Sequence, residues 1–368
     1  MKKNDLTTIL IITILISFLF GSATTYIILF AQNSNTSSKT IKSSTQITLT
    51  EDNSIEKGIA NIYDSVVVIE GYKNNQMTST GTGFIYKKDN NNAYIMTNHH
   101  VVTNCDKFKV ILSDKTELDA DLSGSEAYSD IAVLKVKSDK IKQIVSIGKS
   151  DKLKVGDTLF AVGSPEGKDY AGTVTKGILS GKDRLVEVAL NNSTSSDYYM
   201  KVLQTDVSIN PGNSGGPLCD IDGNVVGITN MKLVDSTVEG MGFAIPIEDA
   251  LYYSEILEKG DKVKRPYIGI SMIDVSNSYY LWENRITIPN NIKSGVVVFE
   301  VSNNSPASKT DLKKGDIITK IDNKTISSVA EFRYVLYKYK PSDTIKITYI
   351  RNNKENKASI KLEEQPNQ

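Results

Sequence analysis

The chain has 368 residues, more than one ordinary domain needs, and this length predicts two folded units with accessory segments. Hydrophobic residues make up 39% and charged residues 23% of the sequence, which is typical of a globular protein. The 43 basic residues are balanced by 43 acidic residues, so charge gives no reason to expect a nucleic acid partner.

An apolar segment comes first in the chain. Residues 6–30 (LTTILIITILISFLFGSATTYIILF) carry no charge and follow Lys2 and Lys3. A helix of this length crosses a hydrocarbon core of about 30 Å. A cleaved secretory signal is the alternative, but the apolar region of such a signal has about 7 to 15 residues and ends in a small-x-small site. The tripeptide LFA at 29–31 is not such a site, so we expect an uncleaved anchor.

The flanks of this segment predict its orientation. Lysines precede it and a polar Ser/Thr/Asn tract follows it, so residues 1–5 are expected in the cytoplasm. Residues 31–54 are polar and contain no aromatic residue, which predicts a flexible linker. We therefore expect a single-pass protein of the cell membrane, with the lipid bilayer around residues 6–30 and everything beyond them outside the cytoplasm.

Residues 55–260 predict the first folded domain. The segment IEKGIANIYDSVV places Ile55, Ile59 and Ile62 at helical spacing, and short β-like runs follow it. Runs such as VVVIEGY, AYIMT, FKVILS and DIAVLKV are separated by Gly, Asn, Asp and Ser turns. This pattern favours an all-β barrel or sandwich over alternating β/α units. The stretch EDALYYSEILEKG predicts a helix that closes the domain.

Residues 266–364 predict a second, smaller domain after a basic connector at 262–265. Its strand candidates are YIGISM, GVVVFEV, DIITKID, TIKITYI and ASIKLEE, and SVAEFRYVLYKYK is helix-like. This mixture predicts an α+β module of ordinary small-domain size.

The chain has two cysteines, Cys105 and Cys219. An exported location permits a disulfide between them, but two isolated, buried cysteines would explain the pair equally well. Two Cys and two His at this spacing do not form a metal cluster, so no metal site is expected.

A serine in a glycine-rich turn is the first candidate for chemistry. The segment NPGNSGGPL carries Ser214 between the strand-like runs QTDVS and NVVGI. Glycine at 212 permits backbone angles that a side chain forbids, so the N–H groups of Gly212 and Ser214 are expected to converge on a developing oxyanion. An ordinary hairpin turn is the alternative for this segment taken alone.

A serine nucleophile needs a base and an orienting carboxylate. The chain has only two histidines, His99 and His100, adjacent in TNHHVV after the run AYIMT. Asp130 stands directly before the apolar run IAVLKV. A surface histidine and a turn aspartate are the plain alternatives for these positions, so the conjunction of the three motifs carries the hypothesis.

TNHHVV, SDIAVLKV and TDVSINPGNSGGPL, in that order, resemble the His, Asp and Ser motifs of the HtrA (Deg) proteases. That family has a mostly β, chymotrypsin-like double β-barrel. Its histidine motif is Thr-Asn-x-His-Val, so the resemblance implies that His100 is the general base and that Asp130 orients it. It also implies that Ser214 attacks the substrate. The backbone of Gly212, Asn213 and Ser214 is then the oxyanion hole, with no cofactor.

The second domain resembles the α+β PDZ domain that follows the protease domain in this family. The resemblance rests on YIGI at 267–270, SPA at 305–307 and LKKGD at 312–316. It implies that the backbone of Ile268, Gly269 and Ile270 binds the terminal carboxylate of a peptide, which adds as a strand. TD at 310–311 departs from the small residue and glycine common in the family, which puts peptide preference in doubt.

The resemblance implies a membrane-anchored endopeptidase that degrades unfolded or misfolded exported proteins and is regulated by peptides at its PDZ domain. Ser208 and Ile209 are expected in the substrate pocket and favour small or medium aliphatic residues before the cut. Motif order suggests a sensor loop at 182–199 and a specificity loop at 232–239. The family's assemblies imply a homotrimer or larger homo-oligomer. A noncatalytic, membrane-tethered chaperone or scaffold is the alternative function.

Overall fold

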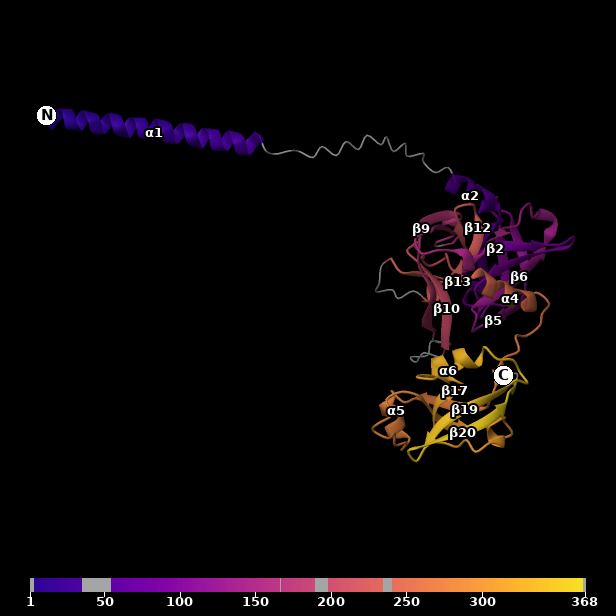
Figure 1. Ribbon diagram of the computed structural model, residues 1–368. Helices are drawn as coiled ribbons and strands as arrows, with labels where there is room; N and C mark the ends of the chain where they lie inside the picture. The colour runs from indigo at the N-terminus through magenta and orange to yellow at the C-terminus, as the bar shows by residue number, and fades with distance from the viewer. Residues whose placement is uncertain (1–2, 35–53, 166, 189–197, 234–239, 367–368) are drawn as a thin grey trace. The chain divides into compact units, whose positions relative to one another are not determined.

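The computed structural model of the protein describes residues 3–34, 54–165, 167–188, 198–233 and 240–366 (Figure 1). The chain divides into two compact units, Met1–Asp52 and Asn53–Gln368. Most of the linker predicted at 31–54 lies outside the described residues.

The first unit contains one helix, α1 (Lys3–Ser34), of 32 residues. Its described apolar side chains, such as Phe18 and Phe20, are exposed. The Ser17 hydroxyl donates to the Thr13 carbonyl at 2.8 Å, so this polar group is satisfied inside the helix. Side chains are described for residues 11–27, and among the described residues no helix is both long and apolar enough to cross a membrane.

Six antiparallel strands close into the first barrel of the second unit, in the spatial order β1-β2-β3-β6-β5-β4. The strands are β1 (Val66–Lys73), β2 (Gln76–Lys88), β3 (Asn92–Thr97), β4 (Lys107–Ile111), β5 (Glu117–Glu126) and β6 (Ile131–Lys137). Closure removes the free edges that a sandwich would keep, so the short apolar runs of this region belong to a barrel.

The second barrel follows in the chain. Its strands are β8 (Thr158–Gly163), β9 (Thr173–Val188), β10 (Tyr198–Thr205), β11 (Pro217–Asp220), β12 (Asn224–Thr229) and β13 (Gly242–Pro246). They follow the order β11-β8-β9-β10-β13-β12, and the pairing of β11 with β12 closes the ring. The short β7 (Ser146–Ile147) runs parallel to β12.

The hairpin of β9 and β10 corrects one expectation. Residues 182–188 and 198–199 were expected in a loop, but they are strand, and Leu185 pairs with Lys201. Most residues of the segment KDRLVEV are polar or partly exposed, so its two-residue period gives little apolar signal. Residues 189–197 of the expected sensor loop lie outside the described residues.

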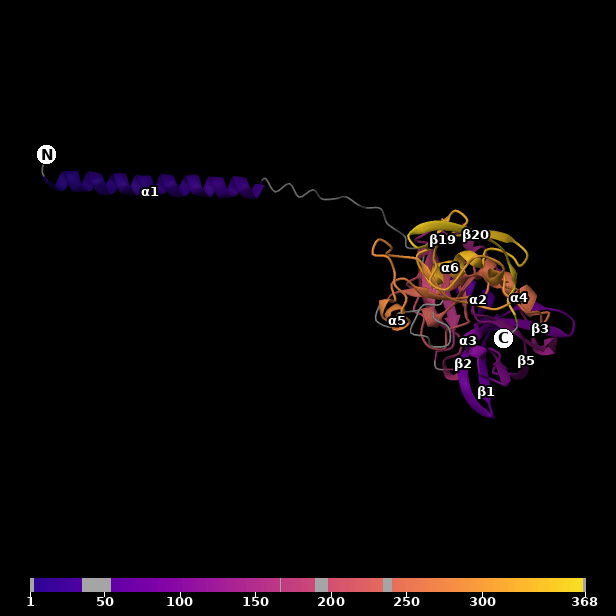
Figure 2. The same cartoon turned by 90° about the horizontal axis from the view of Figure 1, so that it is seen from below.

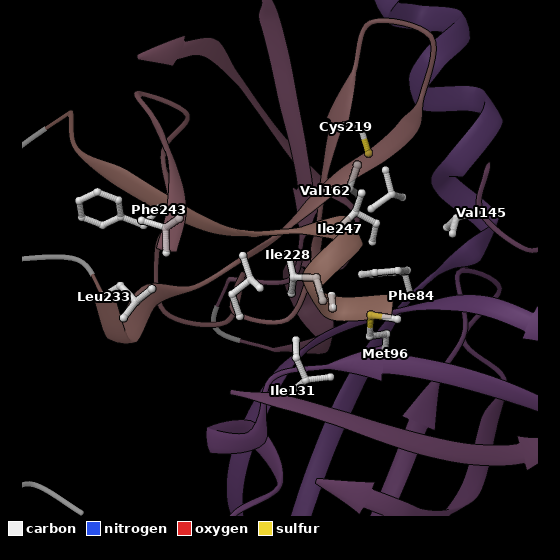
Figure 3. Packing of buried hydrophobic residues seen from close by; sticks show 14 of the residues in the cluster. Phe84, Met96, Ile131, Val145, Val162, Cys219, Ile228, Leu233, Phe243 and Ile247 are labelled. Carbon is white, nitrogen blue, oxygen red and sulfur yellow. The ribbon is translucent and has the colours of Figure 1, made fainter. Parts of the chain in front are cut away.

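The two barrels meet across a buried apolar seam (Figure 3). Phe84, Met96 and Ile131 come from the first barrel, and Val162 and Ile228 come from the second. All five side chains are buried. At roughly 1.5 to 3 kcal/mol per fully buried apolar side chain, such a seam holds the barrels in one fixed arrangement.

Two helices cover this seam. Helix α2 (Ser54–Ile62) packs Ile55, Ile59 and Ile62 against the cluster, as their spacing predicts. Helix α4 (Ile247–Leu257) begins after Pro246 with two acidic residues in its first turn, which suits the positive end of a helix. Its buried residues recur at helical spacing, so one face of α4 lies on the core.

The smaller domain predicted at 266–364 forms a third module after the two barrels, and it begins with β14 (Pro266–Tyr267). Its other elements are β15 (Ile270–Asp274), α5 (Ser278–Glu283), β16 (Val296–Val301), β17 (Ile317–Ile321), β18 (Lys324–Thr325), α6 (Val329–Leu336), β19 (Thr344–Arg351), β20 (Lys354–Lys361) and β21 (Glu363–Glu364). The sheet runs β15-β16-β17-β19-β20, with β18 on β17, while β14 pairs with β21. Strand β15 is therefore an edge strand.

Helix α6 packs against β15 and β17 of this sheet, and Figure 2 shows the module from below, with α6, β19 and β20 labelled. Ser328 caps it by accepting a hydrogen bond from the Glu331 N–H at 3.1 Å. The Glu331 carboxylate accepts from the Ser327 N–H at 2.7 Å in return, which resembles a capping box. Phe332, Val335 and Leu336 are buried beneath the helix.

Both cysteines are free thiols. Cys219 lies in β11 with 0% of its surface exposed, and burial raises the pKa of its thiol well above the usual value. Cys105 is half-buried. Because the thiolate is the reactive form, a water-soluble thiol reagent at mildly alkaline pH is expected to label Cys105 alone in the native chain, and both cysteines after denaturation. Cys105→Ser should remove the native signal, and equal native labelling of both thiols would contradict the fold.

Candidate active site

The turn that carries Ser214 connects β10 to β11 and is bonded to both barrels. Thr82 of the first barrel donates its N–H to the Ser214 carbonyl at 2.9 Å, and its hydroxyl donates to the Gly212 carbonyl at 2.6 Å. The Gly215 N–H donates to the carbonyl of Thr229, in the second barrel, at 3.0 Å. The turn therefore needs both barrels for its shape.

Glycine is required at position 215. Its φ is +84°, and a Cβ there would collide with the Thr97 hydroxyl and the Thr82 carbonyl. A Cβ would also approach the Asn98 N–H at 3.0 Å. Since Thr97 and Asn98 immediately precede the two histidines, this close approach places the serine turn against the histidine segment.

The backbone N–H groups of the turn divide into two kinds. The Asn213 N–H donates to the Asn210 carbonyl at 2.9 Å and is used inside the turn. The N–H groups of Gly212 and Ser214 have no protein acceptor among the described residues, and Gly212 has a φ of +96°. Of the three expected oxyanion donors, Gly212 and Ser214 are therefore the two whose N–H groups are available to donate to an oxyanion.

Asp130 holds His100 by two hydrogen bonds. Its Oδ2 lies 2.7 Å from His100 Nδ1, and its Oδ1 accepts from the His100 N–H at 2.9 Å. The Asp130 side chain is 3% exposed, whereas the His100 ring is 28% exposed. With Nδ1 committed to the buried carboxylate, Nε2 is the ring nitrogen left for a substrate or a serine.

His99 has a different environment from its neighbour. Its Nδ1 lies 3.0 Å from the Ser125 hydroxyl, and its N–H donates to the Asp130 carbonyl at 3.1 Å. It therefore donates to the Asp130 backbone carbonyl, whereas His100 is bonded to the Asp130 carboxylate. The structure separates two histidines that composition alone left equivalent.

The dipeptide Asn230-Met231, which follows β12, contacts both ends of the site. The Asn230 amide donates to Asp130 Oδ2 at 2.8 Å, and the Met231 N–H donates to Ser214 Oγ at 3.0 Å. Asp130 and Ser214 are thus held by consecutive residues. Asn230 could not be predicted from the sequence, because a lone asparagine after a strand carries no local signal.

Among the described residues, the serine hydroxyl has no hydrogen bond to His100 and accepts one from the Met231 N–H. Because Ser214 Oγ acts there as an acceptor, its own proton remains available to a base. Hydrogen bonds between a serine nucleophile and its base are often long or poorly aligned without substrate and tighten only in the complex.

The expected pocket residues lie on the segment before the serine. Ser208 is exposed and its carbonyl accepts from the Thr175 hydroxyl at 3.0 Å. Ile209 is 7% exposed, and its Cδ1 would lie 2.9 Å from a Cβ placed on Gly242. The Ile209 side chain therefore fills space beside Gly242 and limits the size of any neighbouring pocket. Lys232 and Leu233 form part of a short turn, and 234–239 of the expected specificity loop lie outside the described residues.

The expected carboxylate loop leads into β15. Gly269 has a φ of +78°, and a Cβ there would collide with Ser305. The Gly269 carbonyl accepts from the Ser302 N–H at 2.9 Å, which turns it away from the loop's own N–H groups. Because β15 pairs only with β16, its other edge suits the addition of a peptide strand.

Comparisons with known proteins agree with this architecture. A trypsin-like peptidase domain matches residues 81–228 and a PDZ domain matches residues 266–362. The chain is 39% identical over 292 residues to the serine protease Do-like HtrA of Lactococcus lactis subsp. lactis (strain IL1403), covering 78% of this chain and 71% of that protein. It is 42% identical over 290 residues to the serine protease Do-like HtrA of Bacillus subtilis (strain 168), covering 78% and 64%.

Solved structures give the same result. A serine endoprotease from Yersinia pestis matches with a TM-score of 0.63 and 29% identity, over 85% of this chain and 98% of that one. The HtrA-type protease AlgW with a decapeptide matches with a TM-score of 0.65 and 25% identity, over 85% and 99%.

Proposed function

Because the chain belongs to the HtrA-type serine proteases and is therefore a serine endopeptidase, we propose that it degrades unfolded or misfolded exported proteins from a membrane anchor. The observation that carries the proposal is the Asp130–His100 pair joined through Asn230-Met231 to Ser214. A noncatalytic scaffold would not require a histidine oriented by a buried carboxylate beside a serine.

The proposed mechanism is acyl transfer in two steps. Ser214 Oγ attacks a peptide carbonyl while His100 takes its proton, and the Asp130 carboxylate stabilises the imidazolium that forms. The N–H groups of Gly212 and Ser214 bind the oxyanion. His100 then gives its proton to the leaving amine, and water, activated by the same ring, hydrolyses the ester. Each step uses a group that the site already presents.

Ser208 and Ile209 support a preference for small or medium aliphatic residues before the cut. A serine at the base of the pocket offers no charge to a lysine or arginine, and the Ile209 side chain narrows the space beside Gly242. Selection of this kind is weak, since one methylene is worth about 1 to 3 kcal/mol in a hydrophobic pocket. A profile of several aliphatic residues is therefore expected.

A casein digest tests activity and specificity together. The full chain in detergent micelles is expected to cleave casein, and mass spectrometry of the products should place Val, Ala, Ile or Leu before most cuts. Native, disulfide-intact lysozyme serves as a folded control that should resist cleavage. A digest dominated by cuts after Lys or Arg would refute the pocket assignment, and an intact casein would refute the activity.

The proposed anchor is the uncharged segment 6–30 within α1. A helix of the length of α1 spans about 48 Å, more than the roughly 30 Å of a hydrocarbon core. Its exposed apolar side chains and internally satisfied hydroxyls support a lipid environment. The catalytic and PDZ domains would then work outside the cytoplasm.

We also infer that C-terminal peptides bind along the free edge of β15 and that the chain works as a homotrimer or larger assembly. The peptide proposal is supported by the Gly269 turn and the edge strand. The assembly proposal is supported by the family resemblance.

A further inference from the structure

A buried arginine lies where the third module meets the two barrels. Arg265, in the connector before β14, is only 8% exposed. Its guanidinium lies 4.8 Å from the ring centre of Tyr128, 5.8 Å from that of Tyr253 and 4.6 Å from that of Tyr337. The sequence predicts a basic connector at this position, whereas in the structure aromatic rings surround the guanidinium.

The charge of this arginine is met by Glu126, at the end of β5. Arg265 Nε donates to Glu126 Oε1 at 3.0 Å, and a terminal nitrogen donates to Oε2 at 2.8 Å. Burial raises the pKa of Glu126, but the guanidinium and the Ser129 N–H lower it by more, so the pKa is below its usual range. The pair is therefore charged at neutral pH, and the two-pronged geometry suits arginine and not lysine.

The same carboxylate reaches the catalytic turn. Glu126 Oε2 accepts from the Ser129 N–H at 2.6 Å, and Ser129 immediately precedes Asp130. Tyr128 of this turn packs edge-on against Tyr337, with ring centres 5.1 Å apart. The turn at 126–130 is thus held from two sides by Arg265 and by the helix end of the third module.

Asp130 needs such support. Its φ is +54°, a left-handed conformation that aspartate adopts more readily than most residues but that still costs backbone strain, which surrounding contacts must offset. His100 takes its position from both carboxylate oxygens of Asp130. A small displacement of the turn would therefore change the orientation of the base.

We propose that Glu126 and Arg265 are positioning residues for catalysis: they couple the docking of the third module to the placement of Asp130, and through it to His100. This inference rests on the proposed function. In this proposal, docking of the third module changes the active site through the turn at 126–130, which precedes and includes Asp130. The substrate pocket is not involved.

The test compares Glu126→Gln, Arg265→Gln and the double variant with the full wild-type chain in detergent micelles. Each is titrated with a fluorescent fluorophosphonate, and the labelling rate of Ser214 is followed against pH. For either single variant we expect a labelling rate at neutral pH about 10- to 100-fold lower than for wild type, because a misplacement of about 1 Å costs this much. The labelling rate falls at acid pH as His100 becomes protonated. The midpoint of this fall should move to lower pH, because a displaced Asp130 carboxylate stabilises the His100 imidazolium less.

The double variant keeps the test meaningful if a lone buried charge unfolds one of the single variants, since it removes both charges together. Its loss is expected to match that of one single variant and not the product of the two, because both residues act through one contact. A merely structural role would lower the fraction of labelled enzyme and leave the pH midpoint unchanged.

Lys309→Gln is the matched control. Lys309 pairs with Glu363 on the surface of the third module, with Nζ and Oε1 2.7 Å apart, so its replacement leaves no buried charge unpaired. Its labelling rate and pH midpoint should equal those of wild type. An unshifted midpoint in the Glu126 and double variants, or an equal shift in Lys309→Gln, would overturn the proposal. Failure of the wild type itself to be labelled or to cut casein would instead overturn the proposed function.

Discussion

Replacing Ser214 by alanine is expected to lower the turnover number for casein by about 10⁴- to 10⁶-fold, because no other group in the site can form the acyl-enzyme. The change removes one oxygen from a residue that is 5% exposed and whose Oγ, among the described residues, accepts one hydrogen bond, from the Met231 N–H. The fold should therefore survive, and circular dichroism of the variant should match that of wild type. Casein cleavage is followed by release of a fluorescent label.

Ser113→Ala is the matched control for this experiment. Ser113 is exposed and its hydroxyl donates to Asp64 at 2.7 Å, away from the catalytic turn. Its casein cleavage should stay within about twofold of wild type, since surface substitutions of this kind change little. Undiminished cleavage by Ser214→Ala would remove the nucleophile assignment. A wild type that binds casein without cutting it, and that resists fluorophosphonate, would favour a chaperone or scaffold.

Replacing Asp130 by asparagine should lower the turnover number by about 10⁴-fold at neutral pH. The side chain keeps its shape, but it exchanges one acceptor oxygen for an N–H₂ group. Asp130 Oδ2 now accepts from both His100 and Asn230, and Oδ1 accepts from the His100 N–H. An amide cannot satisfy all three donors, so the ring is expected to take the wrong tautomer or to turn.

The measurement is the rate of fluorophosphonate labelling, which reports the reactivity of Ser214 without requiring a protein substrate. Asp316→Asn provides the comparison, because Asp316 is also buried, at 1% exposure, but lies in the third module beside Arg351. That variant should lose stability and keep its labelling rate. A labelling rate for Asp130→Asn equal to that of wild type would show that His100 is oriented by something else.

The sequence predicted the parts of the site that short segments encode. Ser214, His100 and Asp130 each stand next to a strand end, where a turn residue and an apolar run give a local signal. Gly212 was predicted for the same reason, since a glycine-rich turn indicates backbone angles that other residues rarely adopt. The two-barrel order followed from the resemblance, because strand runs alone left a barrel and a sandwich equally open.

What the sequence could not provide depends on contacts between distant segments. Asn230 reaches Asp130 across 100 positions of the chain, and this contact exists only once the second barrel has closed on the first. The occupied N–H of Asn213 depends on the internal bonding of one turn. Arg265 looked like a solvated charge in a connector, and only tertiary packing buries it.

The division of the proposed catalytic groups between the barrels means that a chain with only its first barrel folded would be inactive. His100 and Asp130 are complete in the first barrel, but Ser214 follows β10, and its turn takes its shape from Thr82 and Thr229 together. If the domains are exported as proposed, a chain with only its first barrel across the membrane would carry the base without the nucleophile. Under the proposed export, proteolytic activity would require that both barrels have crossed the membrane and packed together, and this requirement would protect the cell while the chain is being exported.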